Sequence, residues 1–255
     1  MRILLTVEYD GTNYAGWQRQ SNALSVQQAV EEAFERATGE KASVVGAGRT
    51  DAGVHAIGQC AHVDTHTSIP PEKLAYALNL VLPRDIRIRE SRQVRADFHA
   101  RRDAQGKHYR YAIYNAHQDC AVGRFYCTHI RFPLDIEPMR IAAGYIKGKH
   151  DFKCFQAAGS TPVESTVRVI TDITVNRVDN IIYIDVYGTG FLYNMVRIIA
   201  GTLIEVGSGR RSPNSVPEII SSKKRDNAGP TAAAKGLTLV SVNYAHNSLI
   251  QKPGK

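Results

Sequence analysis

The feature that most constrains the fold is a succession of strand and helix signals that runs through the first half of the chain and begins again near residue 107. In the first half, Ile3–Tyr9 is predicted to be a strand, and Ser25–Gln28 has the spacing of a helix capping box. In the second half, Lys107–Tyr114 is predicted to be a strand in which Tyr109 and Tyr111 share a face. We therefore predict an α+β protein with two similar, α/β-sandwich-like subdomains.

The other predicted elements continue this alternation. They are a helix that follows Ser25 and ends near Gly39, strands at Val44–Ala47 and Ile57–Asp64, a helix at Pro71–Leu82, a strand at Ile86–Val94, a helix from Asp135 to about Gly148, a hairpin of Val167–Val175 and Ile181–Tyr187, helices at Phe191–Val206 and Pro217–Ser222, and a strand at Leu237–Tyr244 before a polar tail at 251–255. No flexible linker separates the halves, so we expect subdomains 1–104 and 105–255 to share a broad, mostly antiparallel mixed sheet flanked by helices.

The composition indicates a folded protein with a basic surface. A chain of 255 residues can bury a substantial core, and its formal net charge of +8 suits a polyanion such as nucleic acid. No apolar run approaches the length of a transmembrane helix, and Glu8 comes too early for a signal peptide. These features predict a cytoplasmic protein that does not enter a membrane.

The cysteines and histidines give no metal site. The four cysteines form no CxxC pair, so we expect reduced thiols and no zinc. His62 and His66 flank Val63-Asp64-Thr65, but this segment alternates like a strand, and we interpret both histidines as solvated.

The most informative stretch for chemistry is Gly46–Ala56, in which Asp51 stands among glycines two residues after Arg49. If the segment is extended, Arg49 and Asp51 project to one side and Thr50 to the other. A nearby cation favours the ionised carboxylate that a nucleophile or a base requires. The alternative is a simple turn at Asp-Ala-Gly with a hydrogen bond from the aspartate side chain.

Two further segments carry candidate site residues. Tyr109 lies on the predicted strand at Lys107–Tyr114, and Arg197 lies beside the apolar stripe of the predicted helix at Phe191–Val206. Taken alone, such a tyrosine is more often part of a core or sheet surface, and such an arginine more often reaches for solvent.

In combination, these segments resemble the pseudouridine synthases, and specifically the family of tRNA pseudouridine synthase A. The resemblance covers nearly the whole chain, at Tyr9–Thr12, Gly16–Gln20, Gly48–Ala56, Lys107–Tyr111, Phe191–Gly201 and Ala228–Leu237. The departures are small. Ala233 stands where the family pattern has proline, and Val63 stands where an aromatic residue is common.

The resemblance implies an enzyme that isomerises uridine to pseudouridine in tRNA, on the 3′ side of the anticodon stem-loop, without a cofactor or a metal. Asp51 would be the catalytic carboxylate, attacking C1′ or the uracil C6 or removing a sugar proton. The resemblance also implies substrate-binding roles for four residues. Arg197 would favour ionised Asp51, Tyr109 would lie against the uracil, and Leu237 would supply an apolar contact. Arg49 would contact the RNA backbone or fill the space left by the flipped nucleotide. The second subdomain would complete the cleft.

The resemblance also implies a homodimer that grips tRNA across both subunits. Basic residues that are candidates for phosphate contacts are Arg19, Arg101, Arg102, Lys107, Arg110, Arg210 and Arg211. Two other interpretations stay open. The chain could be a non-catalytic RNA-binding or chaperone module, with Tyr109 and Tyr111 stacking on bases, or a nucleoside N-glycosidase that uses Asp51 and lets water capture the sugar.

Overall fold

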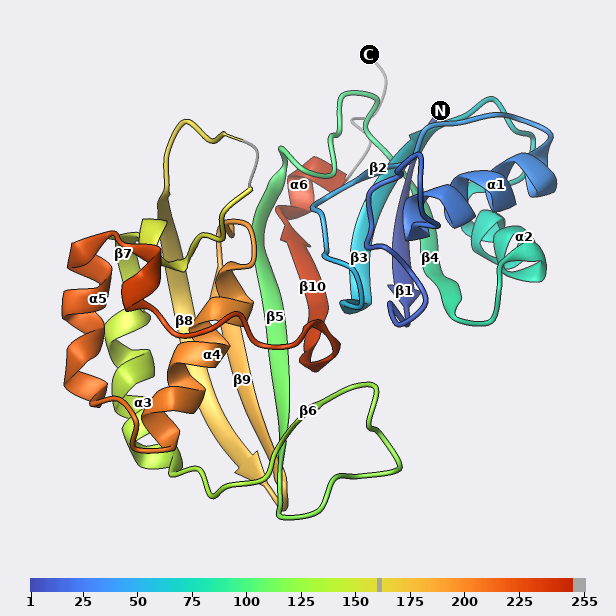
Figure 1. Ribbon diagram of the computed structural model, residues 1–255. Coiled ribbons are helices and arrows are strands. Elements are labelled where there is room, and N and C mark those ends of the chain that lie inside the picture. Colours follow the sequence, from blue (N-terminus) through green and yellow to red (C-terminus); the bar gives the residue numbers. More distant parts are fainter. Residues whose placement is uncertain (160–161, 250–255) are drawn as a thin grey trace. The chain divides into compact units, whose positions relative to one another are not determined.

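The computed structural model describes residues 1–159 and 162–249, and the chain divides into two compact units (Figure 1). The first unit comprises Met1–Gly106 and the residues from Leu239 onward, and the second comprises Lys107–Thr238. Within the described residues there are ten strands and six α-helices, and each unit combines strands with helices. The predicted α+β class is confirmed. The predicted polar tail at 251–255 lies outside the described residues.

The sheet of the first unit is built around β1 (Arg2–Tyr9). It pairs antiparallel with β3 (His55–Asp64) on one side and with β4 (Ile86–Val94) on the other. The short β2 (Val45–Gly46) and β10 (Leu237–Tyr244) both pair with β3. A short helix that the sequence did not predict, α6 (His246–Leu249), follows β10.

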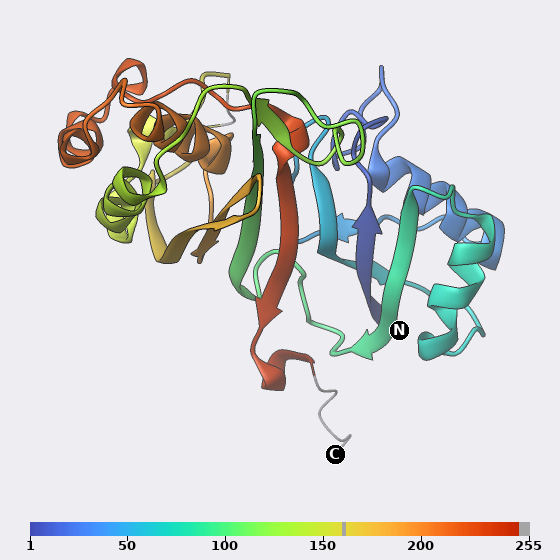
Figure 2. The same ribbon diagram turned by 90° about the horizontal axis from the view of Figure 1, so that it is seen from below.

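Two helices cover one side of this sheet, α1 (Val26–Thr38) and α2 (Leu74–Val81), as Figure 2 shows. The capping signals for α1 are confirmed, because the Ser25 hydroxyl accepts a hydrogen bond from the Gln28 amide at 3.2 Å and Gly39 ends the helix at φ 77°. A 3₁₀ turn at Pro71–Lys73 leads into α2. The residue before Pro83 is extended, as the ring of a following proline requires.

The sheet of the second unit has the strand order β5-β9-β8-β7, with β6 on the other side of β5. The strands are β5 (Ala104–Asn115), β6 (Thr128–Ile130), β7 (Gly148–Asp151), β8 (Val167–Val178) and β9 (Ile181–Gly188). The pairing of β5 with β6 is parallel, whereas β5–β9, β8–β9 and β7–β8 are antiparallel. The predicted hairpin is confirmed, with its turn at Asp179 and Asn180.

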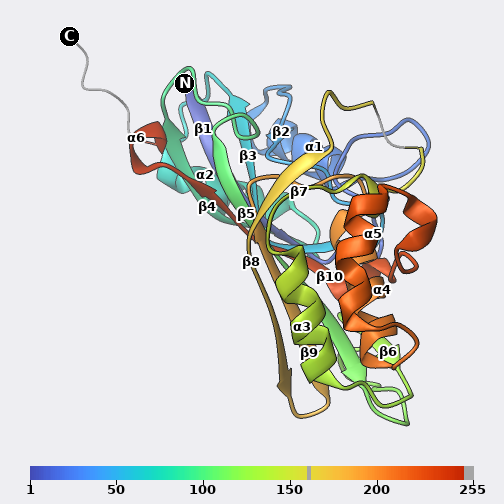
Figure 3. The ribbon, with the colours of Figure 1, turned by 90° about the vertical axis from the view of Figure 1, so that its left-hand side faces the viewer.

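Three helices lie together on one side of this second sheet, α3 (Ile136–Ile146), α4 (Met195–Gly207) and α5 (Val216–Ser222) (Figure 2). Helix α3 packs against β8, α4 and α5 (Figure 3). The predicted start of the helix at Phe191 is wrong: α4 begins at Met195, because Asn194 has the left-handed backbone of φ 60° and ψ 7°. Within the described residues, no helix combines the length and the apolar character that crossing a membrane requires.

Candidate active site

Asp51 lies in the loop between β2 and β3, and this loop is a turn and not a strand. The Asp51 carbonyl accepts a hydrogen bond from the Val54 amide at 3.1 Å, and Gly53 has a φ of 75°. The turn interpretation of Asp-Ala-Gly therefore describes the local backbone correctly. Arg49 is nevertheless exposed and Asp51 partly exposed, while Thr50 between them is buried. The carboxylate of Asp51, the first residue of the turn, is therefore partly accessible to a ligand.

A second loop, 10–17, holds the Asp51 turn in place through backbone contacts. The Trp17 amide donates to the Thr50 carbonyl at 3.1 Å, and the Gly53 amide donates to the Tyr14 carbonyl at 3.3 Å. A Cβ atom at Gly11 would lie 2.0 Å from the Val54 oxygen, and one at Gly16 would lie 2.4 Å from the Thr50 oxygen. The two loops therefore approach so closely that only glycine fits at these two positions.

Buried polar side chains also contact the two loops and help to hold the turn in place. The hydroxyls of Tyr9 and Thr50 lie 2.8 Å apart, and burial raises the pKa of Tyr9 well above its ordinary value. The Gln59 side-chain amide donates to the Gly48 carbonyl at 2.9 Å. Nδ1 of His55 lies 3.1 Å from the Gly11 amide nitrogen. Sequence reasoning missed these supporting roles, because the residues are far apart in the chain and only the glycines of loop 10–17 signalled an unusual backbone.

In the second unit, Tyr109 is buried on the helix-covered face of β5. Its ring meets Phe191 edge-to-face, with 5.0 Å between the ring centroids. Tyr111, two residues on and on the same face, donates its hydroxyl to the Ala233 carbonyl at 2.9 Å. Burial raises the pKa of Tyr111 to about 12. Leu237, where β10 begins, is also buried.

Arg197 on α4 is held by hydrogen bonds from its side chain and does not extend into solvent as an arginine on an apolar helix often does. Its Nε donates to the Ala232 carbonyl at 2.8 Å, and its guanidinium NH1 donates to Oδ1 of Asn194 at 2.7 Å. In return, the Ala232 amide donates to the Arg197 carbonyl at 3.1 Å. Arg197 and Tyr111 thus both bind carbonyls of the same short segment, at Ala232 and Ala233.

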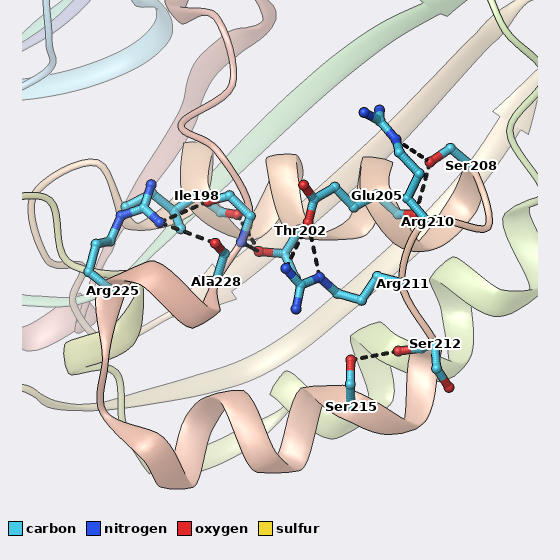
Figure 4. A network of polar contacts seen from close by, with 11 residues as sticks. Ile198, Thr202, Glu205, Ser208, Arg210, Arg211, Ser212, Ser215, Arg225 and Ala228 are labelled. Atoms are coloured by element: carbon cyan, nitrogen blue, oxygen red, sulfur yellow. Dashed lines mark hydrogen bonds and ion pairs between the residues drawn. The ribbon is translucent and has the colours of Figure 1, made fainter.

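The segment that carries Ala232 and Ala233 is itself held against α4. A Cβ atom at Gly201 would lie only 1.8 Å from the Pro230 oxygen, and the Gly229 amide donates to the Thr202 hydroxyl at 2.9 Å. Figure 4 shows Thr202 on α4 and Arg225 beside Ala228 at the start of the segment. These contacts give the Arg197 side chain a fixed partner.

The sequence matches the family described as tRNA pseudouridine synthase over residues 5–103 and 142–245. The chain belongs to this family. It is 51% identical over 242 residues to "tRNA pseudouridine synthase A" of Acetivibrio thermocellus, covering 95% of this chain and 99% of that protein. It is also 51% identical over 244 residues to the protein of that name from Ruminiclostridium cellulolyticum, with the same coverage, and 48% identical over 242 residues to the one from Thermoanaerobacter sp. strain X514.

The two matched stretches of this tRNA pseudouridine synthase family member contain most of the residues that the sequence analysis singled out. Arg49, Asp51, Arg197 and Leu237 lie inside them, and Tyr109 lies between them. The structure places Arg49 and Asp51 in one loop of the first unit. It places Tyr109, Arg197 and Leu237 in the second unit.

Several basic residues predicted to contact phosphate are engaged in intramolecular pairs. Arg110 binds the buried carboxylate of Asp185 through Nε at 2.8 Å, and Arg211 lies 2.9 Å from Glu205. Figure 4 shows the Arg211–Glu205 pair and the hydrogen bond from Arg210 to Ser208. Arg19 pairs with Glu31 at 2.8 Å, whereas Arg101 and Arg102 are exposed.

The interpretation of His62 as a solvated residue is wrong, while His66 is exposed. His62 is buried, and its Nδ1 accepts a hydrogen bond from the Ala100 amide at 3.2 Å. Burial lowers its pKa to about 4. In the part of the chain that the structure describes, no three or more His, Cys, Asp or Glu residues cluster in a way that could hold a metal ion.

Proposed function

We propose that this protein converts uridine to pseudouridine in tRNA, on the 3′ side of the anticodon stem-loop, with Asp51 as the catalytic carboxylate. The observation that carries the proposal is the match, over 95% of the chain, to proteins named tRNA pseudouridine synthase A. The position of Asp51 supports its role, because this partly exposed residue begins a turn that is held on both sides by backbone hydrogen bonds.

The reaction breaks the N1–C1′ glycosidic bond, turns the uracil while it stays bound, and joins C5 to C1′. The isomerisation is redox-neutral. Asp51 attacks C1′ or the uracil C6, or removes a proton from the sugar, and each of these routes requires an ionised carboxylate. A uridine stacked in RNA must first leave the stack, which costs a few kcal/mol.

We assign substrate-binding roles to four more residues. Arg197 favours the ionised form of Asp51, and its two fixed hydrogen bonds support a role that depends on orientation. The ring of Tyr109, held by Phe191, lies against the uracil, and its hydroxyl serves as a hydrogen-bond partner or proton relay. Leu237 supplies an apolar contact. Arg49, exposed beside Asp51, contacts the RNA backbone or fills the space left by the flipped nucleotide.

The decisive experiment is incubation with unmodified tRNA, followed by mapping of pseudouridine along the anticodon stem-loop and by measurement of free uracil. Pseudouridine on the 3′ side of the anticodon loop, absent with the Asp51→Asn variant, is the expected result. Free uracil without pseudouridine would identify an N-glycosidase. Binding without either product would leave a non-catalytic RNA-binding or chaperone module.

The proposal includes a homodimer that works in the cytoplasm and grips one tRNA across both subunits. Sedimentation velocity with and without tRNA measures the oligomeric state, and cell fractionation tests the cytoplasmic location. Mixed dimers of Asp51→Asn chains and chains with neutralised Arg101 and Arg102 should recover activity that exceeds the sum of the parents. A monomer with full activity would contradict the dimer.

A further inference from the structure

Asn194, at the start of α4, has a backbone and a side chain that are unusual for its position. An asparagine that caps a helix N-terminus has an extended backbone and accepts a hydrogen bond from an amide two or three residues later. Asn194 instead has the left-handed backbone of φ 60° and makes no cap hydrogen bond with its side chain. Its Oδ1 atom accepts from NH1 of Arg197 at 2.7 Å. The side chain of Asn194 therefore binds the Arg197 guanidinium in place of a stabilising cap.

The hydrogen bond from Arg197 to Asn194 completes a two-point attachment. Nε of Arg197 donates to the Ala232 carbonyl at 2.8 Å, and NH1 donates to Asn194. A planar guanidinium attached through two of its nitrogen atoms cannot rotate without breaking one of the two hydrogen bonds.

We propose that Asn194 is a positioning residue that sets the orientation of the Arg197 guanidinium. This inference rests on the proposed function, in which Arg197 acts on the ionised form of Asp51. Left-handed backbone at a non-glycine residue costs free energy, and such positions are concentrated at functional sites. Asparagine meets both demands, because it tolerates this backbone better than most residues and supplies an acceptor.

The variant Asn194→Gly separates this role from a structural one. Glycine adopts the left-handed region without strain, which offsets the loss of the hydrogen bond and the greater freedom of the unfolded chain, so the free energy of unfolding should change little. Without the acceptor, kcat for pseudouridine formation should fall about tenfold, equivalent to 1.4 kcal/mol, while tRNA affinity stays within about twofold. The acidic limb of the pH–rate profile should move to higher pH. Asn194→Asp, which keeps an acceptor oxygen, should retain kcat within about threefold of the parent.

Asp179→Gly is the matched control. Asp179 also has left-handed backbone, with a φ of 51°, but it lies in the β8–β9 hairpin turn. This control should leave kcat unchanged. If Asn194→Gly is folded and matches the parent in kcat and pH profile, Asn194 only accommodates the backbone and the inference is overturned.

The variant Arg197→Met, measured in the same assay, distinguishes this failure from a failure of the proposed function. If Arg197→Met keeps full activity, Arg197 has no role in the reaction, and the roles assigned to Arg197 and Asn194 are both wrong. If Arg197→Met loses activity and Asn194→Gly does not, only the positioning role of Asn194 is wrong. In the Arg197→Met background, Asn194→Gly should cause no further loss, because the two side chains act through one interaction.

A separate observation concerns Cys120 and Cys127, in the segment between β5 and β6. Their sulfur atoms lie 3.6 Å apart. The segment folds back on itself between them, since the Tyr126 amide donates to the Gly123 carbonyl at 2.8 Å and Gly123 has a φ of 86°. Cys127 is buried and Cys120 is half-buried. The local backbone thus holds two thiols side by side, one of them accessible.

We propose that Cys120 and Cys127 are an oxidation site that forms an intramolecular disulfide with a low-molecular-weight disulfide such as oxidised glutathione. The Cys120 thiolate attacks one sulfur of the oxidant and expels the other as a thiolate, which takes up a proton. Cys127 then loses its proton and attacks Sγ of Cys120, so that the half of the oxidant bound to Cys120 leaves as a thiolate. The two protein thiols are oxidised and one oxidant disulfide is reduced. Burial raises the pKa of Cys127 to about 11, so the second step should accelerate as the pH rises.

Thiol titration and peptide mapping of the folded full chain after exposure to oxidised glutathione test this site. Of the four cysteines, two should lose their free thiols, and one cross-linked peptide pair should contain Cys120 and Cys127. Cys127→Ser should instead keep a glutathione adduct on Cys120, and Cys60→Ser should behave like the parent. Retention of all four thiols, or a stable adduct on Cys120 in the parent chain, would overturn the proposal.

Discussion

The Asp51 turn and the Arg197 side chain are held in place by different means. The turn is fixed by backbone hydrogen bonds to loop 10–17, at a distance that leaves no room for a side chain at Gly11 or Gly16. Arg197 is fixed by its own side chain, through hydrogen bonds to Asn194 and Ala232. A change in backbone packing should therefore disturb the first arrangement most, whereas the second should be sensitive to the loss of a single polar atom.

The difference has a chemical reason. A carboxylate that attacks or removes a proton must be placed to within a fraction of an ångström, and a short side chain on a rigid turn provides that. A long arginine has many rotamers, so its placement depends on hydrogen bonds near its end. Substitutions in each arrangement should therefore differ in their effects.

Asp51→Asn should remove isomerisation while leaving both arrangements intact. Asparagine is nearly isosteric with aspartate but is neither a nucleophilic carboxylate nor a base, so single-turnover rates should fall about a thousandfold or more. Affinity for tRNA, measured by filter binding, should change less than about threefold. Turnover within tenfold of the parent, on protein with a parental circular dichroism spectrum, would remove Asp51 from the catalytic role.

Arg197→Met should lower kcat by about a hundredfold, in the range seen when one preorganised electrostatic donor is lost. The apolar replacement keeps the packing of α4 but removes the cation that we propose favours ionised Asp51, so the acidic limb of the pH–rate profile should move to higher pH. Arg197→Lys should be milder, because it keeps the charge without the two-point attachment. An unchanged pH profile for the methionine variant would show that Arg197 is not coupled to the carboxylate.

Local signals in the sequence were sufficient for many elements and insufficient for contacts between distant segments. Helix α1 was predictable because Ser25 and Gly39 are recognisable caps. The start of α4 was not, because the apolar spacing continues through Phe191 and Leu192 while the backbone of Asn194 is left-handed. Asp51 was identifiable from its neighbours, but the fit of Gly11 against Val54 joins segments more than forty residues apart. The roles of the site residues stay predictions.

Gly11→Ala should test the backbone arrangement without touching a catalytic group. The new Cβ atom would lie 2.0 Å from the Val54 oxygen, a backbone atom that cannot move without shifting the Asp51 turn. We expect the free energy of unfolding to fall by about 1–3 kcal/mol and kcat of the folded fraction to fall about tenfold.

Gly144→Ala is the matched control for this substitution. A Cβ atom at Gly144, inside α3, would meet nothing within 4 Å, so the change should raise stability by up to about 1 kcal/mol through helix propensity. Urea unfolding and turnover are measured on both variants. If Gly11→Ala has the stability and kcat of the parent, the turn is not held by close backbone contact.

Tyr109→Phe and Tyr109→Leu should separate the ring of Tyr109 from its hydroxyl. Phenylalanine keeps the edge-to-face contact with Phe191, so tRNA binding should persist and kcat should fall less than about tenfold. Leucine loses both ring and hydroxyl, and its kcat should fall further. Equal turnover in both variants and the parent would return Tyr109 to a role in core packing only.

The smallest expected effect is on the pH dependence of stability, to which the titratable groups of His62 and Tyr111 contribute on opposite sides. The pKa of His62, in the first unit, is lowered by burial to about 4 from 6.5. Between these values the unfolded chain binds a proton that the folded chain does not, so stability should fall as the pH drops from 6.5 toward 4. The pKa of Tyr111, in the second unit, is raised by burial to about 12 from 10.0. Above pH 10 the unfolded chain releases a proton that the folded chain keeps, so stability should fall as the pH rises toward 12.

Urea midpoints at pH 5, 7.5 and 10.5 measure these two slopes, with His62→Gln and Tyr111→Phe as the variants. His62→Gln should flatten only the acidic side, because glutamine keeps a hydrogen-bond acceptor but does not titrate. Tyr111→Phe should reduce the alkaline slope without abolishing it, since burial also raises the pKa of Tyr9, Tyr14 and Tyr244. If His62→Gln leaves the acidic slope unchanged, protonation of His62 does not limit stability there. If Tyr111→Phe leaves the alkaline slope unchanged, ionisation of Tyr111 does not limit stability there.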